Sequence, residues 1–462
     1  MGQPATPTDW PSAQRLARGL LSLALILLTL GLALPVGASA YRPASDGALS
    51  PQSPWATDGL HGVASTDAVH GWAVGEYGTI LATTDGGAAW SSQRSGTTEI
   101  LSGAAFSDAT HGWVVGNDYD TGAGVILATT DGGATWSGQG AGWKRTDLLG
   151  VAVADDSHGW VVGRSFEGAS SKSSGLIVTT TDGGATWSAT RSKGVDEFTG
   201  IAFSDATRGW VIGTSYRKAT ETWASVILAT TDGGVTWRKQ YSIREYFVDI
   251  AFGDASHGWA VTADGTILAT TDGGSTWRKR RSLGDELLSG VACSDATRCW
   301  AVGADSGTGA GVILATADGG ATWSKQRSGS HDDLLGVALS DATHGWVVGD
   351  LYDQAYGSDI GVILATTDGG VSWSRQSPGC VNKVKPAFGK RGALVTITGV
   401  GFGAAQAAGS VQFGSAASTA YVAWSDVQIQ CRVPADAAFG AVYVTVTTAL
   451  GTSNAMGFRV KR

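Results

Sequence analysis

One eight-residue phrase recurs along this chain and constrains its fold more than any other feature. It reads Thr-Thr-Asp-Gly-Gly-Ala-Thr-Trp with small variations, and its aspartates are 46, 51, 50, 40, 46 and 50 residues apart. These aspartates are Asp85, Asp131, Asp182, Asp232, Asp272, Asp318 and Asp368. The tryptophans that close the phrases are Trp90, Trp136, Trp187, Trp237, Trp277, Trp323 and Trp373. A period of about 40–50 residues is the length of one four-stranded propeller blade. The sequence therefore predicts an all-β chain with a seven-bladed β-propeller.

The second repeat shows the expected blade in detail. Strand-like runs at 101–107, 113–116 and 125–130 are separated by clusters of Gly and Asp, as hairpins require. No stretch of the chain has helical periodicity. We expect the phrase's aspartate to accept hydrogen bonds from backbone N–H groups one to three residues on. We expect its tryptophan to fill the space between blades.

A Gly-Trp motif recurs in phase with the first phrase. Its tryptophans are Trp72, Trp113, Trp160, Trp210, Trp259, Trp300 and Trp346, and an aspartate precedes each of them. Five of the seven histidines occupy the turn slot just before this motif, at His70, His111, His158, His257 and His344. A position that repeats around a ring belongs to the scaffold. We therefore predict no catalytic role for these histidines and aspartates.

The repeated phrase resembles the Asp-box of BNR-type propellers over residues 58–377. The wording of the repeats is also similar to that of the photosystem II assembly and stability factor family, which runs Gly-Trp-x-Val-Gly and Ile-Leu-x-Thr-x-Asp-Gly-Gly-x-Thr-Trp. This resemblance implies an exported seven-bladed propeller that binds partner polypeptides and catalyses nothing. Sialidases share the Asp-box propeller, so a glycan-active hydrolase or lectin is the alternative. Their Arg-Ile-Pro triplet does not occur here.

The repeats differ from one another in two of their four connections. The links between strands two and three, and between one blade and the next, vary in length and composition, and both should emerge on the same face. Aromatic rings beside carboxylates suit a peptide or a sugar. The candidate binding residues on this face are Tyr119, Asp120, Trp143, Phe166, Tyr216, Trp223, Tyr246, Tyr352, Asp353 and Tyr356.

The first 40 residues have the pattern of a signal peptide. Arg15 and Arg18 precede an apolar run at 20–34, and Ala38-Ser39-Ala40 is a small-x-small cleavage site. We expect cleavage after Ala40, a linker at 41–57 and no membrane span in the mature protein; an uncleaved anchor is the alternative. The net charge of −8 argues against nucleic acid as a partner. A monomer is expected.

The four cysteines allow three pairings. Cys293 and Cys299 flank one turn of the sixth repeat, where the other repeats have no cysteine, so they are predicted to bond. Cys380 and Cys431 would then pair in the tail. An exported protein can hold both disulfides. No metal and no cofactor is expected, because nothing supplies the further ligands.

Residues 380–462 follow the last repeat and lack the repeated phrase. They contain Val395-Thr396-Ile397-Thr398-Gly399, then Val433-Pro434, then Ser453-Asn454 and Phe458. This order resembles the IPT/TIG family of immunoglobulin-like domains, which implies a small β-sandwich. The whole chain is thus predicted to be a secreted or cell-surface, non-catalytic binding protein that captures a protein or glycan on the variable face of its propeller.

Overall fold

The computed structural model describes residues 59–118, 122–140, 143–167, 172–217, 222–282, 284–327, 332–353, 358–377, 380–403, 405–425, 427–449, 451–453 and 456–462. The predicted signal peptide (1–40) and linker (41–57) lie outside these residues. The described chain is all-β, with one short 3-10 turn, η2 (Glu76–Gly78), and no α-helix. It therefore offers no helix of the length and apolarity needed to cross a membrane.

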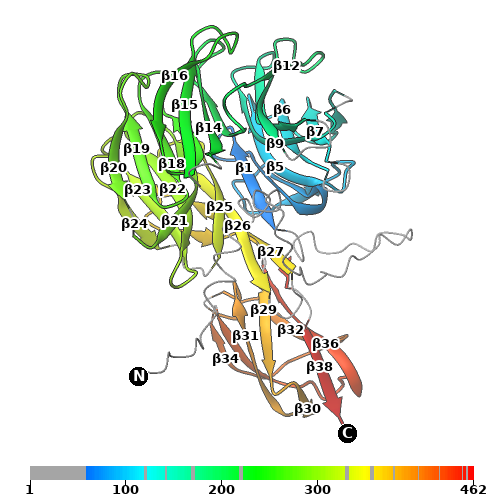
Figure 1. Ribbon diagram of the computed structural model, residues 1–462. Helices are drawn as coiled ribbons and strands as arrows, with labels where there is room; N and C mark the ends of the chain where they lie inside the picture. The colour runs from blue at the N-terminus through cyan, green and yellow to red at the C-terminus, as the bar shows by residue number, and fades with distance from the viewer. Residues whose placement is uncertain are drawn as a thin grey trace, which may run out of the picture.

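The propeller has seven blades, each a four-stranded antiparallel meander whose strands follow chain order (Figure 1). Blade 1 contains β1 (Leu60–Ser65), β2 (Gly71–Gly75), β3 (Ile80–Thr83) and β4 (Ser91–Gln93). Blade 2 contains β5 (Ile100–Phe106), β6 (Gly112–Asn117), β7 (Gly124–Thr129) and β8 (Ser137–Gly138). Blade 3 contains β9 (Thr146–Val153), β10 (Gly159–Phe166), β11 (Ser173–Thr180) and β12 (Ser188–Arg191). Blade 4 contains β13 (Glu197–Phe203), β14 (Gly209–Arg217), β15 (Thr222–Thr230) and β16 (Arg238–Ile243). Blade 5 contains β17 (Phe247–Phe252), β18 (Gly258–Thr262), β19 (Thr266–Thr270) and β20 (Arg278–Ser282). Blade 6 contains β21 (Glu286–Cys293), β22 (Cys299–Asp305), β23 (Gly311–Thr316) and β24 (Ser324–Arg327). Blade 7 contains β25 (Asp333–Leu339), β26 (Gly345–Asp353), β27 (Ser358–Thr366) and β28 (Ser374–Arg375).

The ring is closed by packing between blades 7 and 1. Each first strand lies beside the first strand of the next blade, and β25 lies beside β1. Among the described strands, none is exchanged at this junction, because β1 opens blade 1 and β28 ends blade 7. One apolar cluster fills the junction and includes Leu60, Trp90, Trp346 and Ile363. Burial of apolar area therefore holds the ring shut.

The repeated phrase folds into one turn between the third and fourth strands of every blade. In blade 2, the Thr129 hydroxyl donates to Asp131 Oδ1 and accepts the Gly133 N–H. Asp131 also accepts the Thr135 N–H at 2.9 Å, four residues on rather than the one to three that we expected. The turn places two glycines at positive φ, Gly132 at 71° and Gly133 at 90°. A side chain is strained at such angles, which explains the Gly-Gly of the phrase.

The two sets of tryptophans interlock neighbouring blades. The Trp136 indole donates to Gln93 of the preceding blade, and the Trp72 indole donates to the carbonyl of Gly132 in the following blade. The Trp72 ring also stacks on Phe106 with centroids 3.6 Å apart. The Asp-box tryptophans fill the space between blades, as predicted for them, and the Gly-Trp tryptophans share in this packing. Trp160 with Phe203 and Trp210 with Phe252 repeat the same stacking.

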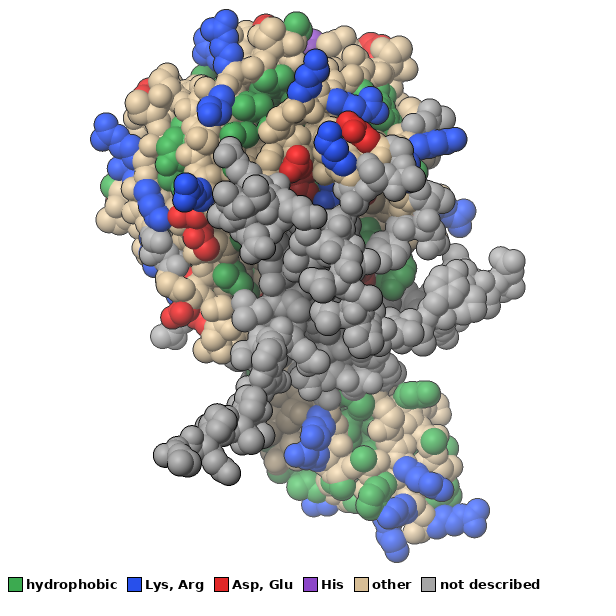
Figure 2. Space-filling view, viewed as in Figure 1, with side chains coloured by type: hydrophobic (Ala, Val, Ile, Leu, Met, Phe, Trp, Pro, Cys, Tyr) green, Lys and Arg blue, Asp and Glu red, His purple; other side chains and the backbone are tan. Residues whose placement is uncertain are grey.

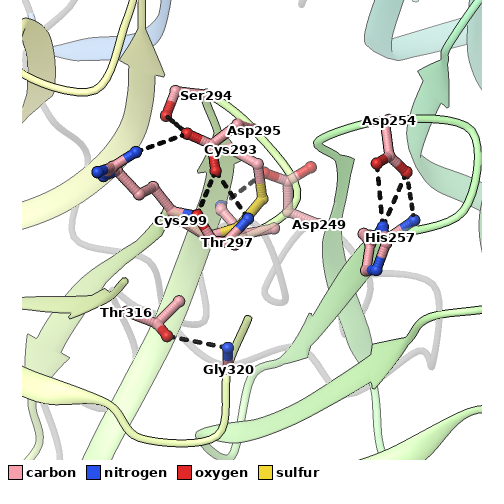
Figure 3. Close-up of a disulfide and its surroundings, with 12 residues drawn as sticks. Asp249, Asp254, His257, Cys293, Ser294, Asp295, Thr297, Cys299, Thr316 and Gly320 are labelled. Carbon is pink, nitrogen blue, oxygen red and sulfur yellow. Dashed lines mark hydrogen bonds and ion pairs between the residues drawn. A yellow bond between two sulfur atoms is a disulfide. The ribbon is translucent and has the colours of Figure 1, made fainter. Parts of the chain in front are cut away.

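A disulfide replaces this aromatic arrangement in blade 6. Cys293 and Cys299 are directly opposite in the β21–β22 ladder and are bonded (Figure 3), as the sequence predicted. In blade 2, the equivalent positions hold Phe106 and Gly112, and a Cβ on Gly112 would lie 2.4 Å from the Phe106 ring. The phenylalanine thus needs a glycine opposite. Blade 6 has neither residue, and a covalent bond joins its hairpin instead.

Residues 380–462 form a β-sandwich. One sheet contains β29 (Cys380–Lys385), β31 (Leu394–Val400), β35 (Gln428–Arg432) and β34 (Tyr421–Ser425) in that order. The second has the order β30 (Phe388–Lys390), β38 (Met456–Lys461), β36 (Gly440–Thr448), β32 (Ser410–Phe413) and β33 (Ala416–Ala417), with β37 (Gly451–Thr452) beside β36. A shared core lies between the sheets and includes Val395, Phe413, Ile429 and Phe458.

The predicted bond between Cys380 and Cys431 is wrong. Cys431 is a free, buried thiol in this core. Cys380 pairs with Val400 of β31, whereas Cys431 pairs with Val395 of the same strand. Five residues of strand separate the two places, which is about 16 Å. A disulfide requires Cα atoms no more than about 7 Å apart.

Candidate functional site

The two faces of the propeller are built from different connections, as predicted. In all seven blades, the first glycine of the Asp-box donates its N–H to a carbonyl in the turn between strands one and two; Gly132 to Thr110 is one example. The other connections hydrogen-bond to each other on the opposite side, as Gly124 N–H to Trp143 and Ala263 N–H to Tyr246 show. We call the first side the repeated-turn face and the second the variable face.

The repeated-turn face uses its polar residues to hold its own turns. His257 Nδ1 lies 3.0 Å from Asp254 Oδ2, and this aspartate also accepts the N–H groups of Ser256 and His257 (Figure 3). The other four histidines of this slot are 2.8–3.0 Å from their aspartates. These bonds lower the pKa of Asp155 and of its counterparts. The expected scaffold role of these residues is confirmed.

One group of possible metal ligands occurs among the described residues. Oxygen and nitrogen atoms of Asp108, His111 and Asp156 lie within 4.8 Å of one another on the repeated-turn face. His111 Nδ1 is engaged at 3.0 Å by Asp108 Oδ2, as in the other histidine turns, and Asp156 accepts a hydrogen bond from Ser107. These side chains are therefore already engaged in hydrogen bonds that hold the turns of this face.

Tall hairpins rise from blades 3, 4 and 7 on the variable face. Strands β14, β15, β26 and β27 have nine residues each and β10 and β11 have eight, whereas β2 and β18 have five. Several candidates lie at the ends of these strands, rather than in loops as the sequence suggested. Tyr216 and Trp223 are cross-strand partners in blade 4, and Tyr352 is paired with Asp359 in blade 7.

Three further candidates, Asp353, Phe166 and Trp143, lie among the described residues. Asp353 is paired with Ser358 at the end of the blade 7 hairpin. Phe166 ends β10 and is partly buried, with the Arg164 guanidinium 5.1 Å from its ring centroid. Trp143 lies in the link between blades 2 and 3 and packs against the apolar cluster there. Tyr119, Asp120 and Tyr356 lie outside the described residues.

A buried charge network anchors the hairpins of blades 3 and 4, and the sequence analysis did not find it. Arg164 of β10 donates from Nε to Asp147 Oδ2 at 2.7 Å and from Nη1 to Glu197 Oε2 at 3.2 Å. The three side chains are at most 10% exposed. Thr214 donates a further hydrogen bond to Glu197 Oε1. The available signal was an arginine inside an otherwise apolar strand, Gly-Trp-Val-Val-Gly-Arg.

Tyr246 completes this network. Its hydroxyl donates to Glu197 Oε1 at 2.9 Å. Burial, followed by the nearby Glu197 carboxylate, raises the pKa of Tyr246 well above its ordinary value. The tyrosine, in the link between blades 4 and 5, was predicted as a binding residue, and the structure places its polar end inside the network of blades 3 and 4.

A second buried ion pair lies at the base of the blade 7 hairpin. Arg375 Nη1 is 3.3 Å from Asp332 Oδ2, and the Asp332 side chain is fully buried. Removing one partner of such a pair leaves a buried charge uncompensated. Ion pairs between residues that are distant in the sequence thus hold the tall blades at their bases.

The fold defines a class of protein: an Asp-box β-propeller followed by an immunoglobulin-like sandwich. Residues 239–327 match the sequence model of the family described as Photosynthesis system II assembly factor YCF48, and residues 380–460 match that of the IPT/TIG domain. The chain therefore carries YCF48-like repeats and a C-terminal IPT/TIG domain.

Solved structures similar to this chain include two of YCF48 and one of a GH74 xyloglucanase. One is YCF48 bound to D1 peptide, at 19% identity over 69% of this chain and 96% of that chain, with a TM-score of 0.49. YCF48 from Cyanidioschyzon merolae has 21% identity over 68% of this chain and 96% of that chain, with the same TM-score of 0.49. The GH74 xyloglucanase from Xanthomonas campestris has 13% identity over 88% of this chain and 74% of that chain, with a TM-score of 0.52. The last likeness shows the propeller fold alone.

Curated relatives match a short part of the chain. A cyclomaltodextrin glucanotransferase from Paenibacillus macerans is 42% identical over 77 residues, and one from Bacillus sp. (strain 17-1) is 43% identical over 77 residues. Each match covers 16% of this chain, and the chain spans 10% of the length of these relatives.

Proposed function

We propose that this protein is an exported, non-catalytic binding protein that captures a polypeptide on the variable face of its propeller. The observation that carries the proposal is the unequal height of the blades on this face alone. The hairpins of blades 3, 4 and 7 rise above blades 1 and 5, and buried ion pairs fix their bases. Rigid projections of unequal height give a surface a shape of its own, which specific recognition requires.

A polypeptide is the favoured partner for two reasons. The family model that matches blades 5 and 6 describes an assembly factor, a kind of protein that acts on other proteins. The strands of these hairpins also contain Tyr216, Trp223 and Tyr352 near their ends, and aromatic residues are enriched in protein interfaces. Export is supported by the disulfide, because such bonds persist in oxidising compartments.

The rival function is a glycan-active hydrolase or lectin, which the same fold also serves. A glycosidase needs two carboxylates at a defined separation beside its substrate. Asp147 and Glu197 are the buried carboxylates at the base of the blade 3 and 4 hairpins, and both are engaged by Arg164 rather than open to a substrate. This engagement favours binding over catalysis.

The two functions are separated by substitutions at the hairpins. The exported chain is immobilised, incubated with native envelope extract, and the bound proteins are quantified by mass spectrometry. Tyr119→Ala, Trp223→Ala and Tyr352→Ala should each remove the same specific partner while leaving the melting temperature unchanged, because these side chains are expected to contribute to recognition more than to the core. The matched control is Val235→Ser, an exposed residue of blade 4 on the opposite face, which should leave capture intact.

The enzyme function predicts another pattern. Purified protein would release reducing sugar from one member of a glycan panel, and Asp353→Asn or Asp120→Asn would stop this release. Turnover of this kind, or capture that is indifferent to all three aromatic substitutions, would overturn the proposal.

A further inference from the structure

The two domains of this chain carry opposite net charge. The sandwich, residues 380–462, has eight Lys and Arg against two Asp and Glu, a net charge of +6. The propeller region, residues 59–379, has 21 basic against 35 acidic side chains, a net charge of −14. Figure 2 shows Lys and Arg side chains on the sandwich and no acidic ones on the visible side. The overall charge of −8 conceals this separation.

Three of these cations lie together on the outer side of one sheet. Lys390, Arg459 and Lys461 are exposed there on the adjacent strands β30 and β38, and Lys390 is paired with Lys461. No salt bridge neutralises these three cations among the described residues of the sandwich. Exposed acidic side chains are nearly absent from the domain, where Asp436 is the one in the described residues.

Aromatic rings lie among these cations on the same side of the sheet. Phe388 is paired with Arg459 and is 50% exposed, and Tyr443 of β36 is 65% exposed. The solvent-facing side of a sheet is ordinarily polar, so exposed rings there indicate a contact surface. We call Phe388, Lys390, Tyr443, Arg459 and Lys461 the basic sheet face.

The rings and cations of this surface are in direct contact. Lys461 Nζ lies 3.4 Å from the centroid of the Phe388 ring. Beside this face, the Arg391 guanidinium lies 4.0 Å from the centroid of Phe439, which is 49% exposed. Each cation therefore lies against a ring that is about half exposed. A ligand that offered both an anion and an apolar ring face would satisfy the two groups together.

We infer that the basic sheet face binds an anionic polysaccharide. Carboxylates or phosphates on the polymer pair with Arg459, Lys461 and Lys390, while a sugar ring lies on the exposed Tyr443 ring. The acidic propeller repels the same polymer, so the sandwich alone holds it. The disulfide in blade 6 is of a kind that persists in oxidising, extracytoplasmic compartments.

The test measures binding of the whole chain to polygalacturonate and to fully methyl-esterified pectin, which shares the backbone but has no charge. We expect binding of the acidic polymer that weakens with salt, and no binding of the ester. The double variant Arg459→Gln/Lys461→Gln should weaken binding by about tenfold or more. Tyr443→Ala should weaken it by about threefold or more at unchanged charge.

A matched variant controls for net charge. Lys383 and Lys385 are exposed on β29 of the other sheet, so Lys383→Gln/Lys385→Gln removes the same charge elsewhere on the domain. We expect this variant to bind like the wild type. Equal loss in both double variants, failure of the wild type to bind polygalacturonate, or equal binding of single-stranded DNA through the same residues would overturn the inference. So would self-association through this face, detected by sedimentation and abolished by Arg459→Gln/Lys461→Gln. Hairpin variants of the propeller should not change the result, so this test is independent of the proposed function.

Discussion

Seven equivalent positions on the first strands line the ring, and one of them carries a charge. Six are glycines that follow a β-bulge, at Gly62, Gly103, Gly150, Gly200, Gly290 and Gly336. A Cβ on Gly62 would lie 2.9 Å from the carbonyl of Ser102 in the next blade. Blade 5 has Asp249 instead, whose carboxylate accepts the N–H groups of Ile250 and, in blade 6, Val291. One side chain thus links two blades at the cost of burying a carboxylate.

Asp249 should make stability depend on pH in an unusual direction. Burial raises its pKa from 3.8 to about 6. Its contribution to stability is therefore complete below about pH 4 and is lost as the pH rises through 6. Relative to Asp249→Asn, the wild type should lose at most about 3 kcal/mol of unfolding free energy between pH 4 and pH 7. Urea denaturation at a series of pH values measures this difference.

Asp272 of the same blade provides the contrasting control. Hydrogen bonds from the Thr276 hydroxyl and N–H lower the pKa of Asp272. Its contribution is present above the unfolded pKa and is lost as the pH falls. The advantage of wild type over Asp272→Asn should shrink in acid, so the two variants have opposite trends. If the two stability differences changed with pH in the same direction, ionisation of Asp249 would not be lowering the free energy of unfolding.

At the scale of the hairpin, the space between neighbouring blades is filled in one of two ways at equivalent positions. Some blades use a phenylalanine stacked on a tryptophan, and blade 6 uses a disulfide. Blades 2, 4 and 5 place a phenylalanine against the Gly-Trp tryptophan of the preceding blade, with glycine opposite. Blade 6 presents Cys293 to the cluster around Trp259 and bonds it to Cys299. Either arrangement fills the seam and fixes the turn.

We predict that Cys293→Phe/Cys299→Gly retains most of the wild-type stability without a disulfide. The new ring should stack on Trp259 as Phe252 stacks on Trp210. The control Cys293→Ser/Cys299→Gly loses both the bond and the ring, and should be less stable by about 2 kcal/mol from the loop entropy alone. Chemical denaturation of the three proteins in non-reducing buffer decides the matter, and equal destabilisation of both variants would contradict the exchange.

At the scale of the whole molecule, the propeller depends on the junction between blades 7 and 1, which closes the ring. Trp346 of blade 7 is 2% exposed and meets Trp90 of blade 1 edge to face, with centroids 6.4 Å apart. Because blades 1 and 7 share no strand, this cluster closes the ring by apolar contact. The stability of every blade is therefore coupled to the junction.

Trp346→Ala should destabilise the whole propeller. The expected loss is about 3–5 kcal/mol, as for other buried tryptophans. Limited proteolysis should then cut several blades together, since an opened ring exposes both of its ends. The control is Val371→Ala, which removes an apolar side chain from blade 7 at a position that is 87% exposed. Cleavage confined to blade 7 would argue against a cooperative ring.

The sequence by itself determined the blades, their number and the division into two faces. The two motifs each recur seven times in alternation along the chain, so each copy supports the assignment of the same strands and turns in the others. It also identified the Cys293–Cys299 bond, because both partners belong to one hairpin. Local pairing of this kind depends on chain spacing, which a sequence displays directly.

The tertiary structure decided everything that joins distant segments. Arg164 meets Glu197 across two blades, and Asp249 reaches Val291 in the next blade. Cys431 remains free because β31 separates its pairing position from that of Cys380. The basic sheet face appears only when β30, close to the start of the sandwich, pairs with β38 at its end. Such contacts depend on strand order and register across the fold, which no repeat in this sequence encodes.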